Sequence, residues 1–591
     1  MAPTTTRPQP SRNSTELAPR ADGSGLLADA VRHSAGRTGA VFLFSAASAA
    51  AAVALPAALG HTLDLLLDGA PGIRAAVALC TVLVAAEVLF DVLEALAGGT
   101  TSARSTAWLR RRGIAHLLSV APHRAANRFT PGDLVTRLTG NAAEAGTAPT
   151  TAAIGLASLL VPAGGLIGLA LIDLRLLLVF LAGIPLLALL LRAFARGSSD
   201  SISRYQGVQA DISTRLLEAL GGARTVAAAG TAERERVRVL EPLPELAAHG
   251  RRMWRLYGRA SVGSGILVPL LTTGVLAVGG MRLVGGDLSV GDLLAASRYA
   301  ALAAGLGGIV GQLGSLLRSR AGAGRVAEVL SLPAVPYGTR PLPAEGPGRL
   351  ELRGVTVTRG GASVLRGVDL VVPGGTTTAV VGRSGAGKST LAAVAGRLTD
   401  PDAGMVTLDG VPLTEADPAD LRREIGYAFE RPVLFGDTVG GAIAFGPRTP
   451  SEPEVEAAAR AAGADTFVRL LPAGYTTPLA DAPLSGGELQ RLGLARAFAH
   501  AGRLLVLDDA TSSLDSVTEL HVGRALVHDV RAGTRLLIAH RVSSAARADQ
   551  VAWLEDGHVR AVGPHECLWE EPAYRAVFAD GTDTGRNPDG S

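Results

Sequence analysis

The sequence predicts an α-helical membrane domain of six spans followed by a soluble α/β domain. The first observation is composition: the chain of 591 residues is 48% hydrophobic, only 18% charged and 4% aromatic. This balance is not that of an ordinary soluble protein. The second is distribution, because long apolar runs occur only before residue 330. After that point, short β-branched runs alternate with helical stretches, which indicates a largely parallel sheet covered by helices.

Six apolar runs are each long enough to cross the hydrocarbon layer of about 30 Å, which requires about 20 helical residues. They cover residues 39–60, 74–98, 150–172, 174–192, 259–281 and 290–317. For any single run, the alternative is a buried helix of a soluble core. The polar stretches between spans two and three and between spans four and five are too long for turns, so we expect those spans to continue as helices beyond the membrane.

Arginine placement predicts the orientation. Many arginines lie in the N-terminal tail and between spans two and three, whereas the connections at 61–73, at Asp173 and at 282–289 hold few. Positively charged loops stay on the cytoplasmic side, so we expect a multi-pass protein of the cell membrane with its N-terminus and soluble domain in the cytoplasm. The same arginines account for much of the basic excess behind the net charge of +3, so no nucleic-acid partner is needed.

The chain is expected to divide into five parts. Residues 1–38 lack an apolar core with a cleavage site and are expected to be a cytoplasmic tail without a cleaved signal peptide. The two cysteines lie far apart in the sequence and imply neither a disulfide framework nor a metal site. The predicted parts are the tail 1–38, the membrane domain 39–330, a proline-rich linker 331–347, the soluble domain 348–580 and a disordered tail 581–591.

The only lysine of the chain, Lys388, closes a glycine-rich loop of the pattern G-x-x-x-x-G-K-[ST]. An apolar strand precedes this loop and a helix follows it, as in a P-loop. Backbone N–H groups of such a loop cradle phosphates, a compact ammonium reaches the β- and γ-phosphates, and the hydroxyl of Ser389 is offered to Mg²⁺. The sequence therefore predicts bound ATP and Mg²⁺. The predicted nucleotide contacts in this loop are Gly382, Ser384, Gly385, Gly387, Lys388, Ser389 and Thr390.

Three further motifs follow in the soluble domain. Asp508 ends a continuous apolar run that is typical of a buried parallel strand, so its carboxylate is expected beside the P-loop, where Mg²⁺ needs a ligand. His540 ends a second such run and is expected to contact the γ-phosphate; the alternative is a structural histidine. Residues 485–487 open a helix and are expected to point free N–H groups at an anion. They are Ser485, Gly486 and Gly487.

Together with Leu484–Arg491 and Ser513–Asp515, these motifs resemble those of an ABC transporter of the exporter type, over about residues 39 to 580. Residues 130–139 and 218–226 resemble its two intracellular coupling loops. The resemblance implies the ABC exporter fold and a dimer of two half-transporters that sandwich two nucleotides. It places Asp515 and the signature Ser485–Gly487 among the nucleotide contacts, with the signature facing the partner's P-loop. It also implies a small or amphipathic substrate of unknown identity and surrounding membrane lipid.

Three positions depart from the family pattern on the side that binds this chain's own nucleotide. Asp509 stands where a glutamate usually polarises the attacking water, and Glu430 replaces a glutamine that helps to bind Mg²⁺ and water. Arg359 replaces the aromatic residue that stacks on adenine, although a guanidinium also stacks on a base. The resemblance assigns Asp509, His540 and Glu430 to catalysis, and Ser389, Asp508 and Glu430 to the metal. The stretch 476–483 before the signature is also shorter than usual.

Because these departures lie on one side and the signature is intact, we expect a heterodimer in which this chain holds the weakly hydrolysing, degenerate ATP site. The alternatives are a homodimeric exporter that tolerates the replacements and a regulatory ATP-binding subunit with little turnover. A soluble ATPase of DNA repair or translation carries a similar signature, but six fused spans argue against it.

An acidic stripe runs along the second span. Glu87, Asp91 and Glu94 are spaced to share one helical face. A charge at the bilayer centre costs about 2.5–3.5 kcal/mol, so these carboxylates are expected to face a cavity or to pair, with Arg298 as a candidate partner. One interpretation is a pathway for a cationic or amphipathic substrate. The other is structural pairing, or a position below the edge of the bilayer.

Overall fold

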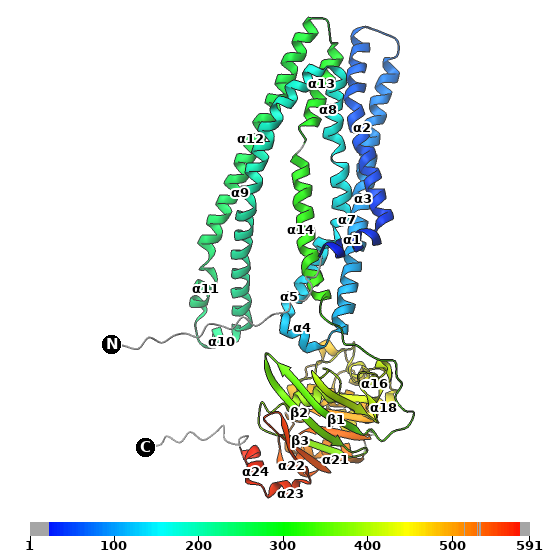
Figure 1. The fold of residues 1–591 in the computed structure, drawn as a ribbon, viewed down its shortest axis with the longest axis vertical. Coiled ribbons are helices and arrows are strands. Elements are labelled where there is room, and N and C mark those ends of the chain that lie inside the picture. The colour runs from blue at the N-terminus through cyan, green and yellow to red at the C-terminus, as the bar shows by residue number, and fades with distance from the viewer. Residues whose placement is uncertain (1–22, 306, 513, 529, 531–532, 580–591) are drawn as a thin grey trace, which may run out of the picture. The chain divides into compact units, whose positions relative to one another are not determined.

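The computed structural model describes residues 23–305, 307–512, 514–528, 530 and 533–579. It divides into two compact units (Figure 1). The first takes the chain to His116 and then Thr130–Ser331, and the second takes Leu117–Phe129 and everything from Leu332. The segment Leu117–Phe129 thus groups with the second unit, although it lies within the range 39–330 expected to form the membrane domain. The predicted tail 581–591 and residues 1–22 of the predicted tail 1–38 lie outside the described residues.

The first unit is entirely helical in its described part, and long helices or helix pairs occupy the six predicted spans. By length and composition, three described helical stretches are able to cross a membrane, and two shorter apolar helices lie at Leu174–Gly183 and Pro269–Val284. The second and fourth spans continue well beyond their apolar parts, as expected from the long polar stretches. The three membrane-crossing stretches are Ala35–Leu67, Ile73–Ser119 and Pro131–Ile172.

Long helices α9 and α12 of the first unit pack side by side along their lengths (Figure 1). The elements are α1 Gly23–His33, α2 Ala35–Leu67, α3 Ile73–Ser119, α5 Pro131–Thr136, a π-helical turn Arg137–Asn141, α6 Ala142–Gly146, α7 Ala148–Ala157, α8 Leu160–Ile172, α9 Leu174–Gly221, α10 Ala223–Ala228, α11 Ala232–Leu240, α12 Leu243–Val284, α13 Val290–Ala303 and α14 Gly307–Leu330. The two loops that resemble coupling loops therefore contain the short helices α5 and α10.

Helices α2 and α13 meet at their backbones. A Cβ atom on Gly60 would lie 2.5 Å from the Gly291 carbonyl oxygen, so only glycine permits this approach. Close contact between small residues is a common way for membrane helices to pack. Asp64 of α2 then accepts hydrogen bonds from Ser289 Oγ at 2.6 Å and from Gly291 N at 2.7 Å. These bonds satisfy donors at the start of α13.

The predicted pairing of Arg298 with the acidic stripe of α3 is wrong in this structure. Arg298 is exposed and forms no ion pair with Glu87, Asp91 or Glu94, all of which lie in the described part. The physical reason is topology: α13, which carries Arg298, packs on α2, α8 and α12 rather than on α3. Asp91 instead accepts a hydrogen bond from Ser48 Oγ of α2 at 2.5 Å.

The second unit contains two sheets. A six-stranded sheet has the order β10-β9-β3-β8-β7-β6 and is parallel except for β10, as predicted from the alternating pattern. An antiparallel sheet has the order β2-β1-β4-β5. The strands are β1 Leu350–Arg359, β2 Ala362–Val372, β3 Thr377–Val381, β4 Ala403–Leu408, β5 Val411–Pro412, β6 Ile425–Phe429, β7 Leu504–Asp508, β8 Thr534–Ile538, β9 Gln550–Glu555 and β10 His558–Gly563.

The rest of the regular structure described for the second unit is helical. The helices are α4 Pro122–Arg128, α15 Lys388–Ala395, α16 Pro418–Glu424, α17 Val439–Ala444, α18 Glu452–Ala461, α19 Asp465–Leu470, α20 Gly486–Ala499, α21 Ser516–His528, α22 Val542–Ala546, α23 His565–Trp569 and α24 Pro572–Ala579, with 3₁₀ turns at Gly474–Thr476 and Leu479–Asp481.

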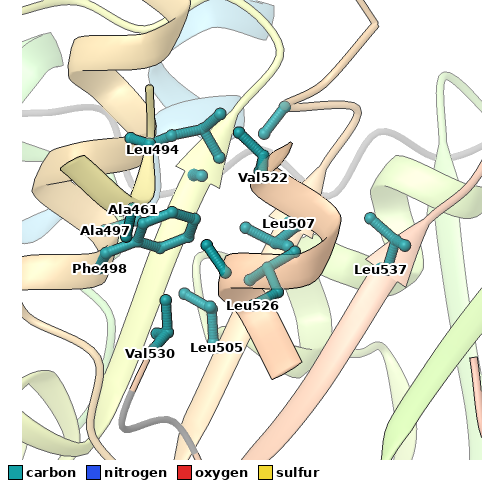
Figure 2. Packing of buried hydrophobic residues seen from close by; sticks show 14 of the residues in the cluster. Ala461, Leu494, Ala497, Phe498, Leu505, Leu507, Val522, Leu526, Val530 and Leu537 are labelled. Carbon is teal, nitrogen blue, oxygen red and sulfur yellow. The ribbon is translucent and has the colours of Figure 1, made fainter. Parts of the chain in front are cut away.

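Strand β7 is fixed by a large apolar cluster. Leu505 and Leu507 are fully buried, and Figure 2 shows them among side chains that include Phe498 of α20 and Leu526 of α21. A strand that is buried on both faces has little freedom to shift. This packing therefore sets the position of Asp508 and Asp509, which come directly after Leu507 in the chain.

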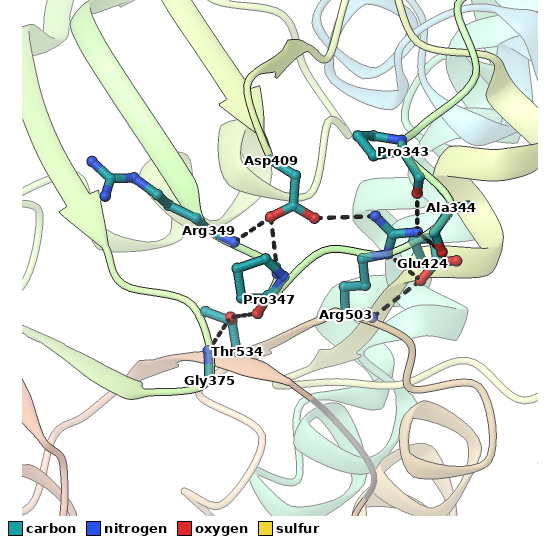
Figure 3. Close-up of polar contacts among 10 residues, drawn as sticks. Pro343, Ala344, Pro347, Arg349, Gly375, Asp409, Glu424, Arg503 and Thr534 are labelled. Carbon is teal, nitrogen blue, oxygen red and sulfur yellow. Dashed lines mark hydrogen bonds and ion pairs between the residues drawn. The ribbon is translucent and has the colours of Figure 1, made fainter.

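The C-terminal part of the predicted linker is bound by polar side chains of the second unit (Figure 3). Arg503 donates to the carbonyl oxygens of Pro343 and Ala344, and its Nη1 lies 3.1 Å from Asp409 Oδ2. The other oxygen of Asp409 accepts from the backbone N–H groups of Gly348 and Arg349 at 3.0 and 2.8 Å. Polar side chains thus hold a segment whose prolines provide no backbone N–H.

Replacing Arg503 with methionine should destabilise the second unit. The Arg503 and Asp409 side chains are 13% and 5% exposed, so the change leaves a largely buried carboxylate without its cation. We expect a loss of about 2 kcal/mol and a melting temperature about 4–8 °C lower, measured by thermal unfolding of the full chain in lipid.

The matched control for this change is Arg349→Met, because the Arg349 side chain pairs with Glu351 while 53% exposed. Exposed ion pairs contribute little, so this variant should melt close to the unchanged chain. Equal melting temperatures for the two variants would contradict a stabilising role of the Arg503 contacts.

Candidate functional site: a nucleotide-binding loop

The glycine-rich loop joins β3 to α15 in the way the P-loop pattern predicts. Gly385 and Gly387 have φ angles of 83° and 103°, a region that favours glycine. A Cβ on Gly382 would lie 2.3 Å from the Leu554 carbonyl oxygen, so this position has no room for a side chain. The sequence folds into this tight turn because glycine stands at each of these points.

Lys388 is 6% exposed and its ammonium folds back over the loop. Nζ donates to the carbonyl oxygens of Gly382 at 2.8 Å and Arg383 at 3.0 Å. Burial lowers the pKa of Lys388, while the carboxylates of Asp509 and Asp508 act in the opposite direction. The Lys388 ammonium therefore lies among the loop carbonyl oxygens, within reach of the charges of these two carboxylates.

Asp508 ends β7 beside this loop, as predicted. Its Oδ2 accepts a hydrogen bond from the Tyr427 hydroxyl at 3.3 Å, and within the described residues its Oδ1 is buried without a hydrogen-bond partner. Burial raises the pKa of Asp508; the Ser389 hydroxyl acts against it, and the charges of Asp509 and Glu430 add to it. An orphaned buried carboxylate oxygen next to a hydroxyl fits a cation such as Mg²⁺.

No group of three or more histidine, cysteine, aspartate or glutamate side chains forms a metal cluster in the described part of the chain. Mg²⁺ does not require one, because it is usually held by one or two carboxylates together with phosphate oxygens and water. The donors around Asp508 therefore suit a metal that arrives with a nucleotide.

Two predicted catalytic residues meet in the structure. His540 Nε2 and Asp509 Oδ2 lie 2.8 Å apart, although the residues are 31 positions apart in the chain. The backbone of Asp509 has a φ angle of 52°, an unusual conformation for a residue with a side chain. The short Asp509 carboxylate is thus already directed at His540.

Glu430 and Arg359 are more exposed than the rest of the site. The Glu430 side chain is 55% exposed and lies 3.6 Å from Arg431 Nε, yet its charge still acts on Asp508. Arg359 ends β1 on the surface, just before the Gly360–Gly361 turn. The Arg359 side chain is therefore exposed in this structure.

The signature residues differ in one respect from the expectation of free N–H groups. Ser485 caps α20, and the Glu488 carboxylate accepts hydrogen bonds from both Ser485 N and Ser485 Oγ at 2.8 Å. The expectation is wrong for the Ser485 N–H, because serine followed three residues later by glutamate forms a capping box. Asp515 likewise accepts from Thr518 N at 3.2 Å at the start of α21.

Gln490 has no role predicted from the sequence, yet the structure buries it against the loops that carry Glu430 and Asp509. Its side chain is 1% exposed, and Nε2 donates to the carbonyl oxygens of Glu430 at 3.2 Å and Asp509 at 3.3 Å and to Ser512 Oγ at 3.4 Å. A glutamine inside a helix is usually exposed, so its burial depended on tertiary neighbours.

Comparisons with known proteins agree with this geometry. A model of the ABC transporter family matches residues 365–512, and a model of the ABC transporter transmembrane region matches residues 38–305. An ABC transporter ATP-binding protein, RamA, of Streptomyces coelicolor is 56% identical over 97% of this chain and 88% of its own length. The human mitochondrial potassium channel ATP-binding subunit is 35% identical over 74% of this chain and 61% of its own length.

A solved structure agrees as well. A bacterial Atm1-family ABC exporter with ATP bound superposes with a TM-score of 0.73 at 25% identity, covering 94% of this chain and 99% of that one. Both family models match this chain, the transmembrane region first and the ATPase domain after it. The chain therefore belongs to the ABC transporter family, as a half-transporter of the exporter fold.

Proposed function

We propose that this chain is one half of a heterodimeric ABC exporter of the cell membrane. Its own P-loop forms a weakly hydrolysing ATP site, and its signature completes a competent site on the partner chain. The contact between Asp509 and His540 carries this proposal. The carboxylate in the place of the general base is one methylene shorter than glutamate, and it already lies 2.8 Å from His540.

In the proposed own site, the loop N–H groups and Lys388 bind the phosphates of ATP. Ser389 and Asp508 would hold Mg²⁺, with Glu430 beside them, and the ion would neutralise charge on the β- and γ-phosphates. The Asp509 carboxylate would have to orient the attacking water while one of its oxygens contacts His540 Nε2. A displacement of about 1 Å costs on the order of 10²-fold in rate, so the shorter side chain supports weak hydrolysis.

In the proposed second site, α20 presents its N-terminal end to the partner's nucleotide. Ser485 and the glycines after it suit a phosphate because a helix N-terminus favours negative charge. The Glu488 carboxylate, which now accepts from Ser485, would have to turn away from an arriving phosphate.

The orientation proposed for the membrane domain rests on the arginine-rich segments. They lie in the N-terminal tail and in the stretch between spans two and three. Both are expected on the cytoplasmic side together with the ATPase domain.

The first test is Mg-ATP hydrolysis by the purified chain in lipid, with Lys388→Ala as the blank. ATP binding with little turnover supports the degenerate site and a missing partner. Turnover at a rate typical of intact half-transporters contradicts it and indicates a self-sufficient homodimer. Binding without turnover, even after a partner with an intact glutamate is supplied, indicates a regulatory subunit.

The acidic stripe of α3 suggests a cationic or amphipathic substrate. The Asp91 carboxylate is exposed on this single chain apart from its bond to Ser48, and Glu87 and Glu94 are partly buried. We expect the replacement of all three by glutamine to abolish transport of a cationic dye in vesicles while nucleotide binding is kept. Unchanged dye transport by a well-folded variant would assign the stripe to structure alone.

A further inference from the structure

One buried amide joins the loops that surround the proposed nucleotide site. Gln490 lies in α20, just over one helical turn after Ser485. Its Nε2 contacts the loop after β6 through the Glu430 carbonyl oxygen, and the loop after β7 through the Asp509 carbonyl oxygen and Ser512 Oγ. These loops are far apart in the sequence, and Gln490 is almost completely buried between them.

We propose that Gln490 is a positioning residue that sets the separation between Glu430 and Asp509 and thereby the geometry of the Mg²⁺ site. Since this inference rests on the proposed nucleotide function, it concerns the same site. Gln490 bonds the backbone carbonyl oxygens of these two residues and not their carboxylates, so it fixes the points from which the side chains extend.

Because Gln490 is buried, the two loops have little freedom to move away from it. A buried amide nitrogen that loses its acceptors is left unsatisfied, so a shift of either loop away from Gln490 is unfavourable. A second feature acts in the same direction, because Asp508, which directly precedes Asp509, is fixed by the apolar cluster around β7. Gln490 therefore holds the Glu430 loop close to Asp509, which directly follows the strand that ends at Asp508.

The test is a Mg²⁺ titration of nucleotide binding to the full chain in lipid nanodiscs, with a fluorescent ATP analogue as the probe. The variant is Gln490→Met, which keeps the length of the side chain and removes its N–H donors. We expect the half-saturating Mg²⁺ concentration to rise about tenfold, as for other residues that orient metal ligands. Affinity for the analogue without Mg²⁺ should not change, because the P-loop itself is untouched.

The chain offers a matched control in Gln550. Its Nε2 also donates to a backbone carbonyl, that of Val371 at 3.0 Å, and to a hydroxyl, Thr378 Oγ1 at 2.9 Å, but it contacts none of the three atoms that Gln490 holds. Gln550→Met should leave the Mg²⁺ dependence unchanged even where it lowers the melting temperature. Ser512→Ala removes only one acceptor, and we expect it to raise the half-saturating Mg²⁺ about twofold.

The outcomes separate this inference from the proposed function. An unchanged Mg²⁺ dependence in a well-folded Gln490→Met variant overturns the positioning role, as does an equal rise in Gln550→Met. If Gln490→Met does not fold, Ser512→Ala decides, and no rise in that variant overturns the proposal. If the unchanged chain and Lys388→Ala bind the analogue equally, the nucleotide function itself fails.

Discussion

Replacing Asp509 with glutamate is expected to raise ATP turnover by about 10²-fold, which corresponds to a barrier lower by about 2.7 kcal/mol. The added methylene moves the carboxylate outward from a backbone whose position is fixed by β7 and by the hydrogen bond between Gln490 and the Asp509 carbonyl oxygen. The measurement is phosphate release by the purified chain in lipid, at a concentration that allows two copies to pair.

Two controls make this prediction specific. Asp509→Asn has the size of the native side chain but does not accept a proton, so it should not gain activity. The glutamate variant combined with Lys388→Ala should lose the gain, which excludes a contaminating ATPase. If Asp509→Glu binds nucleotide but its turnover is unchanged, the length of this carboxylate does not limit hydrolysis, and the case for a degenerate site is lost.

Replacing Lys388 with alanine is expected to weaken ATP binding by about 10²–10³-fold, or about 3–4 kcal/mol. The ammonium now donates to two carbonyl oxygens of the loop, and in the complex it would exchange these neutral acceptors for charged phosphate oxygens. Equilibrium binding of ATP to the full chain in lipid measures the loss.

The control for this second prediction is Lys388→Arg. It keeps the charge but brings a planar fork into a loop where Gly382 has no room for even a Cβ atom, so it should restore only part of the affinity. An alanine variant that binds ATP as well as the unchanged chain would show that the loop does not depend on its lysine.

Much of the fold was readable from the sequence, because its signals are local. Apolar runs of membrane length indicated the helices of the first unit, and continuous apolar segments indicated the parallel strands that end at Asp508 and before His540. The glycine pattern around Lys388 indicated the phosphate loop because glycine readily adopts the backbone angles found at Gly385 and Gly387, whereas other residues rarely do.

The tertiary structure decided which distant side chains meet. It separated Arg298 from the acidic stripe of α3, since helix packing rather than charge sets which spans are neighbours. It directed Asp509 at His540 and buried Gln490 between two loops. Hydrogen bonds between residues far apart in the chain leave no periodic signal in the sequence. The sequence by itself therefore determined the domains and the nucleotide loop, whereas the placement of groups around that loop depends on how strands and helices pack.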